Sequence, residues 1–80
     1  MEGYFLIEAS SGMVWDVATE LMNIEGMKMA HVVTGNYDVI AFAEFSDINE
    51  LTSIIQTIQK IKGLEKSQTA VAMPNPNPNK

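Results

Sequence analysis

The residues with the clearest chemical potential form one short stretch, Thr34-Gly35-Asn36-Tyr37-Asp38, which joins two apolar runs. Gly35 and Asn36 tolerate the positive φ of a tight turn, so we expect a β-hairpin here. Asp38 then places a carboxylate at the entrance of the second strand. In one interpretation this carboxylate accepts hydrogen bonds from backbone N–H groups of the loop. In the other it faces a small cleft and binds an ammonium group, while N–H groups near Gly35 bind a carboxylate, which together would recognise a free amino acid.

Other candidate catalytic residues are few. His31 is the single histidine and the chain has no cysteine, so no zinc site of thiolates and imidazoles is expected. No GxSxG, P-loop or HExxH spacing occurs. We therefore expect no catalytic residue, no metal and no cofactor. A small cofactor-free enzyme that uses an enclosed cavity beside His31 or Trp15 remains the alternative, with Trp15 expected to be partly buried beside the first helix.

The charge balance argues against a nucleic-acid partner. The net charge is −5, the few lysines are scattered, and there is no arginine to contact phosphates. The start of the chain has no basic leader and no long apolar segment, so we expect a soluble, cytoplasmic protein with no membrane contact. With 80 residues the chain is one small domain, whose core is marginal without a staple such as a partner chain.

Hydrophobic periodicity divides the chain into alternating strands and helices. Ser10 or Ser11 is expected to cap the first helix, and Asp47 with Glu50 resembles a capping box for the second. The expected strands are Tyr4–Ala9, Met27–Val33, Val39–Phe45 and Leu64–Met73, and the apolar helical stripes run over Val14–Met22 and Leu51–Ile61. The domain is expected to span residues 1–73, and the Pro/Asn-rich residues 74–80 to form a disordered tail.

The two halves of the chain resemble each other. The apolar stripe from Val14 and the glycine at position 26 coincide, after a shift of 37 residues, with the stripe from Leu51 and with Gly63. A doubled βαβ unit with a central hairpin predicts an α+β, ferredoxin-like βαββαβ fold. Its four-stranded antiparallel sheet would carry both helices on one face, as in dimeric α/β barrels.

The other face of this sheet is also apolar. An antiparallel strand with one wet face should alternate polar and apolar residues, but Val39–Ala43 and Phe5–Ile7 are apolar throughout. The chain offers no further element to cover that face. We therefore expect a second copy of the sheet to cover it in a two-fold symmetric dimer, the alternative being a poorly covered surface on a monomer.

At these residues the chain resembles the ligand-binding domain of the Lrp/AsnC family of transcription regulators, also called the RAM domain. The resemblance covers Tyr4 to about Met73. It depends chiefly on the Val33-Thr34-Gly35-Asn36-Tyr37-Asp38 hairpin, with support from three further motifs. These are Gly26-Met27, Gly63-Leu64 and Ser67-Gln68-Thr69 at the entrances of strands.

The resemblance implies a domain that dimerises through its sheet, assembles into a dimer of dimers or an octamer, and binds amino-acid effectors between dimers. Carried over by position, the ligand-binding residues would be Thr34, Gly35, Asn36, Tyr37 and Asp38, together with Gln68 and Thr69 from the last strand. Asp38 would be tolerated because it lies at an interface where a ligand ammonium or backbone donors satisfy it.

One departure from the family pattern bears on function. Full-length members carry an N-terminal helix-turn-helix domain, whereas here the first strand begins within a few residues of Met1. The chain resembles the stand-alone form of the module, so direct DNA binding is not expected. Such a module would sense amino acids by itself or co-assemble with a full-length Lrp/AsnC regulator.

Overall fold

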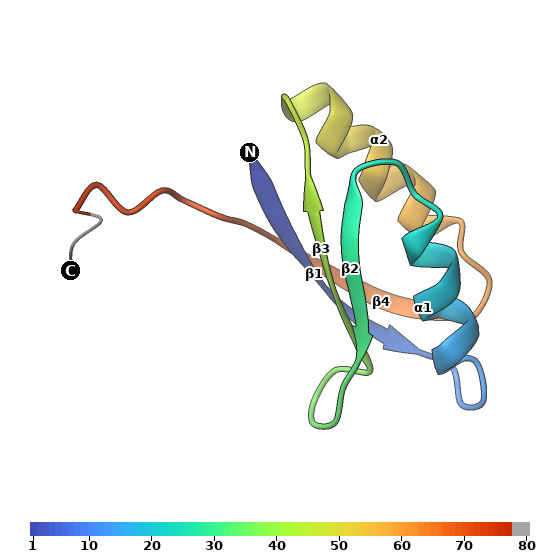
Figure 1. The fold of residues 1–80 in the computed structure, drawn as a ribbon. Helices are drawn as coiled ribbons and strands as arrows, with labels where there is room; N and C mark the ends of the chain where they lie inside the picture. The colour runs from blue at the N-terminus through green and yellow to red at the C-terminus, as the bar shows by residue number, and fades with distance from the viewer. Residues whose placement is uncertain (78–80) are drawn as a thin grey trace.

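A computed structural model describes residues 1–77 of the chain. The elements follow in the order strand, helix, strand, strand, helix, strand (Figure 1). They are β1 (Glu2–Ala9), α1 (Val14–Met22), β2 (Met27–Val32), β3 (Val39–Glu44), α2 (Ile48–Gln59) and β4 (Leu64–Val71). The strands form one antiparallel sheet in the order β2-β3-β1-β4, and both helices lie on one side of it (Figure 1). The predicted ferredoxin-like fold is confirmed.

The hydrophobic core lies between the sheet and the two helices. Along β1 and β3 every second side chain faces the helices, and Phe5, Ile7 and Ala41 on this side are fully buried. The amphipathic helices complete the core with their apolar stripes. The buried apolar residues are Phe5, Ile7, Val17, Ala18, Leu21, Met27, Val39, Ala41, Ala43, Phe45, Leu51, Ile54 and Ile58.

The two helices begin differently. Asp47 caps α2 as predicted: its Oδ1 accepts from the Glu50 N–H at 2.9 Å, and Glu50 Oε2 accepts from the Ser46 N–H at 2.7 Å. The predicted cap of α1 was wrong, because Met13 occupies the N-cap position and no side chain caps it. Gly12 adopts a positive φ of 82° in the turn after Ser10, which moves the helix start beyond the serines.

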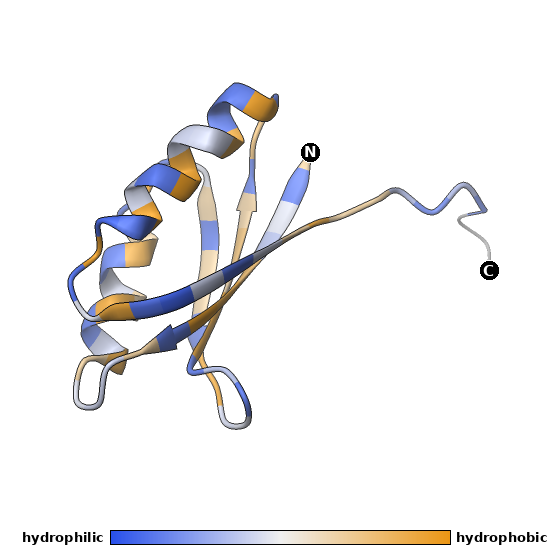
Figure 2. Ribbon diagram, turned by 180° about the vertical axis from the view of Figure 1, so that it is seen from behind, coloured by the Kyte–Doolittle hydropathy of each residue, from blue (hydrophilic) through white to orange (hydrophobic). Residues whose placement is uncertain are grey.

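The face of the sheet opposite the helices is not covered by any element among residues 1–77 and carries an apolar centre. We call this surface the open face; at its centre lie Tyr4, Leu6, Met29, Ile40, Phe42 and Ala70, which pair across neighbouring strands. The rings of Tyr4 and Phe42 pack with their centroids 5.0 Å apart. In Figure 2 the strand β3 has mostly hydrophobic colours, whereas much of β4 is hydrophilic. Both faces of the central strands are therefore apolar, as the sequence indicated.

Asp38 closes the end of the β1–β3 ladder. Its N–H donates to the Ile7 carbonyl at 2.8 Å, and its Oδ2 accepts from the Ala9 N–H at 2.8 Å. The pairing of β1 with β4 shifts its register between Glu8 and Ala9. The carboxylate thus satisfies a partly buried backbone donor at an irregular position of the strand.

No helix among residues 1–77 is long and apolar enough to cross a membrane. Residues 74–77 continue beyond β4 as exposed chain, and the last three residues of the expected tail, 78–80, lie outside the described part.

Gly26 is expected to be intolerant of substitution. It has a φ of 94°, and an added Cβ would lie 2.8 Å from the Glu44 carbonyl oxygen, a backbone atom. Gly26→Ala should lower the free energy of unfolding by about 2 kcal/mol or more, measured by urea denaturation. Gly12→Ala is the matched control, since Gly12 also has positive φ but nothing within 4 Å, and it should cost only about 1–2 kcal/mol. Equal losses would contradict the close approach at Gly26.

Asp38→Ala should destabilise the fold by about 1–3 kcal/mol, because the Ala9 N–H loses its acceptor. Asp38→Asn retains an acceptor oxygen at the same position and should cost less. Chemical denaturation of the two variants measures the difference. If both substitutions cost the same, the hydrogen bond to Ala9 does not account for the contribution of Asp38.

Candidate functional site

A small hollow lies on the open face where β1 and β4 meet the β2–β3 hairpin. Its volume is about 310 Å³, and its lining is Leu6, Glu8, Tyr37, Lys66, Ser67 and Gln68. Tyr37 comes from the hairpin, while the other residues come from the two strands. We call it the corner hollow.

One hydrogen bond ties the hairpin to the last strand at this position. Tyr37 Oη donates to Gln68 Oε1 at 2.8 Å across 31 residues of sequence. Gln68 pairs with Leu6 of β1, whose side chain lies on the open face, so the Tyr37 phenol also reaches this side of the sheet. The structure therefore brings together two of the predicted ligand-binding residues, Tyr37 and Gln68.

The remaining predicted site residues have other positions. Thr34, Gly35 and Asn36 are exposed at the tip of the hairpin, where Gly35 alone has positive φ, at 111°. Asp38 is half-buried and its carboxylate already accepts from the Ala9 N–H. This is the backbone-bonded arrangement that was the first interpretation of Asp38.

Thr69 lies on the other side of the sheet from Gln68. It pairs with Phe5, whose side chain is fully buried beneath the helices, and adjacent residues of a strand point to opposite faces. Thr69 is thus separated from the corner hollow by the sheet itself.

Two charged residues of the corner hollow were not identified from the sequence. Glu8 and Lys66 are directly paired across β1 and β4. Among residues 1–77 one ion pair has its charged atoms within 4.0 Å, that of Lys28 with Glu44 at 3.8 Å. Glu8 and Lys66 therefore form no ion pair with each other. Because side chains alternate along a strand, the sequence indicates that Glu8 shares a face with Leu6, and Lys66 with Gln68. It does not give the register in which the two strands pair, so it does not show that Glu8 and Lys66 are neighbours.

The alternative is an enzyme with a cavity between the sheet and the helices beside His31 or Trp15. Neither residue lines the hollow between the two helices or the corner hollow. His31 is exposed on edge strand β2, opposite Ile40. Trp15 is 74% exposed, so the expected partial burial was wrong within this chain. Among residues 1–77 no group of three or more His, Asp or Glu side chains is placed to hold a metal ion.

Residues 2–80 match the family model described as the Lrp/AsnC ligand binding domain. The chain is 27% identical over 73 residues to the HTH-type transcriptional regulator FL11 of Pyrococcus abyssi, and the aligned region covers 91% of this chain and 48% of that protein. It is 33% identical over 57 residues to the homocitrate synthase of Sulfurisphaera tokodaii, and this aligned region covers 71% of this chain and 12% of the enzyme. The chain therefore spans about half of the regulator and a small part of the enzyme.

The fold is also that of solved structures. The structure of the hypothetical protein PHS023 from Pyrococcus horikoshii superposes with a TM-score of 0.84 at 25% identity, covering 95% of this chain and 93% of that one. The family match covers the whole described domain, including the hairpin and the strand that form the corner hollow. The chain belongs to the Lrp/AsnC ligand-binding domain family.

Proposed function

We propose that this chain is a regulatory module that pairs with a second copy through its open face and binds a free amino acid at the corner hollow. The observation that carries the proposal is the hydrogen bond between Tyr37 and Gln68 at 2.8 Å, beside the separate charges of Glu8 and Lys66. A hollow of about 310 Å³ is at the lower end of ligand pockets, roughly 300–1,000 Å³, and suits a small ligand.

The polar lining of the corner hollow complements a zwitterion. The Glu8 carboxylate would accept from the ammonium group of the ligand, and the Lys66 ammonium would donate to its carboxylate. The carboxamide of Gln68 offers further hydrogen-bonding groups. Leu6 supplies an apolar wall for a side chain, so the lining favours an amino acid over a simple anion.

The exposed hairpin would form the outer wall of the site. In this proposal Thr34, Gly35 and Asn36 face a neighbouring dimer, whose surface closes the corner hollow on binding. Asp38 positions this wall through the bond of its carboxylate to the Ala9 N–H. Thr69 faces the helices, so it takes no part in the site.

The family relatives support a role in ligand sensing. A transcription regulator and an enzyme, homocitrate synthase, both contain a region similar to this chain within longer proteins. The property that such different proteins can share through this region is ligand binding, as the family description states. In this proposal the module acts by changing the assembly of its own oligomer or of a full-length Lrp/AsnC regulator with which it co-assembles.

The first test is the oligomeric state. Phe42→Lys places a charge at the apolar centre of the open face and should convert the wild-type dimer or larger assembly to a monomer, as measured by light scattering at micromolar concentration. Ile48→Lys is the control, since Ile48 is a 59% exposed apolar residue at the start of α2 and its replacement should leave the mass unchanged. A wild-type protein that is already a stable monomer would contradict pairing through the open face.

The second test is calorimetric titration of the wild-type protein with each of the twenty amino acids. At least one should bind, and Tyr37→Phe should weaken its affinity about 2- to 13-fold, because the variant loses the hydrogen bond that holds the Gln68 carboxamide in the site, and one neutral hydrogen bond contributes about that much. Thr69→Val, on the opposite side of the sheet, should leave the affinity unchanged. An oligomer with no response to any amino acid at millimolar concentration would instead indicate a purely structural assembly subunit.

A further inference from the structure

A second and larger hollow lies between α1 and α2, on the helix-bearing side of the sheet. Its volume is about 1180 Å³, and apolar side chains including Ile24, Ile54 and Ile61 contribute to its lining. We call it the helix groove. It lies on the side opposite the open face, so pairing of two copies through their sheets would leave it accessible.

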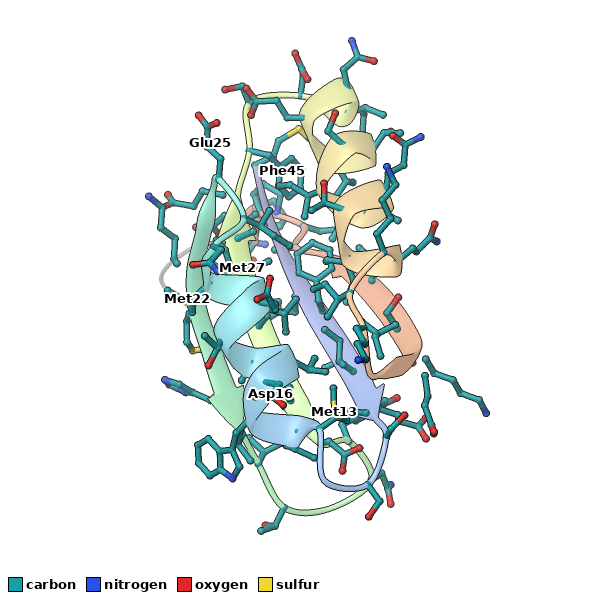
Figure 3. All side chains as sticks on the ribbon, turned by 90° about the vertical axis from the view of Figure 1, so that its right-hand side faces the viewer. Met13, Asp16, Met22, Glu25, Met27 and Phe45 are labelled. Carbon is teal, nitrogen blue, oxygen red and sulfur yellow. The ribbon has the colours of Figure 1, made fainter. Side chains whose placement is uncertain are left out.

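The helix groove has an unequal distribution of charge. Six of the ten carboxylate residues of the chain line it, against two lysines. The end of α1 and the start of α2 lie at the same end of the groove, where Figure 3 places Glu25 and Phe45, while Asp16 and Met13 lie towards the other end. The carboxylates of the first end are Glu20, Glu25, Glu44, Asp47 and Glu50, and the lysines of the second are Lys60 and Lys62.

Two of the carboxylates at the first end, Glu20 and Glu25, are unfavourably placed in the isolated chain, whereas Asp47 and Glu50 cap the N-terminus of α2. The C-terminal end of α1 carries partial negative charge from unpaired carbonyl groups, and its last turn contains no basic residue. Glu20 in that turn and Glu25 just beyond it add full negative charges. Lys28 pairs with Glu44 at 3.8 Å and compensates only one carboxylate of this end. A cationic group bound here would relieve the repulsion.

We propose that the helix groove binds an amphipathic helix from a separate protein, with basic residues at the end that lies against Glu20 and Glu25. The apolar face of the bound helix would contact the isoleucines of the floor, in the mode of a helix docked in a groove. The 12 residues of α2 extend over about 18 Å, which accommodates about three turns. The volume also exceeds the roughly 300–1,000 Å³ of typical small-molecule pockets.

The charge pattern also selects against a second copy of this chain as the occupant. The chain has a net charge of −5, and most of its carboxylates lie on the helix-bearing side. Two such surfaces would repel each other. A helix with lysines in its last turn and glutamates in its first matches both ends of the groove and also the direction of its own dipole.

The test uses a synthetic peptide of this pattern, with glutamates in the first turn, leucines at helical spacing in the middle and lysines in the last turn. Titrated into isotope-labelled wild-type protein, it should shift the amide resonances of residues that line the groove. A second peptide of the same composition, with lysines and glutamates mixed equally at both ends, should bind at least fivefold more weakly, because it cannot place all its lysines against Glu20 and Glu25. Equal affinity of the two peptides, or no binding at millimolar concentration, would overturn the proposal.

Protein variants separate this site from general attraction to an acidic surface. The double variant Glu20→Lys, Glu25→Lys should bind the first peptide at least tenfold more weakly, whereas Glu65→Lys, which changes an exposed carboxylate outside the groove, should bind it like the wild type. Equal weakening in both would contradict the proposal. The affinity of the wild type should also fall between about 50 and 500 mM salt, because exposed charges are screened. An affinity independent of salt would contradict the electrostatic part of the proposal, whatever the folding of the variants.

Discussion

The central constraint on this protein is a four-stranded sheet with apolar side chains on both faces and a single layer of helices. Phe5 and Ala41 are buried beneath the helices, while Ile40 and Phe42 lie on the side that no element of the described part of the chain covers. Burying each large apolar side chain contributes about 1.5–3 kcal/mol, so leaving one face wet forgoes stabilisation that a domain of 80 residues needs. A partner on the open face is the arrangement that satisfies this constraint, and it determines which other surfaces remain available.

Two such surfaces differ in their chemistry. The corner hollow is small and places a carboxylate and an ammonium group on neighbouring strands, whereas the helix groove is larger, has an apolar floor and is mainly acidic. They lie on opposite sides of the sheet. A ligand at the first and a protein at the second would therefore not compete for space, and coupling between them would have to pass through the sheet and its core.

The hairpin illustrates how neighbouring residues divide structural and chemical roles. Asp38 holds the end of β1 through the Ala9 N–H, while Tyr37, one residue earlier, reaches Gln68 on the open face. The conformation of the hairpin is thus fixed by one residue and its chemistry is presented by the other. This explains how a carboxylate is accommodated at the entrance of a strand without any ligand, because a backbone donor already satisfies it.

The sequence by itself determined the order and type of the elements, the cap of α2, the internal repeat and the apolar character of both sheet faces. Each of these follows from the types and spacing of residues along the chain. It also identified the hairpin and Gln68, through the family resemblance. The tertiary structure decided the rest. The pairing of Asp38 with Ala9 spans 29 residues, and the meeting of Glu8 with Lys66 depends on strand order and register. Local patterns do not contain that information, since a shift of one residue in register would turn every side chain to the other face.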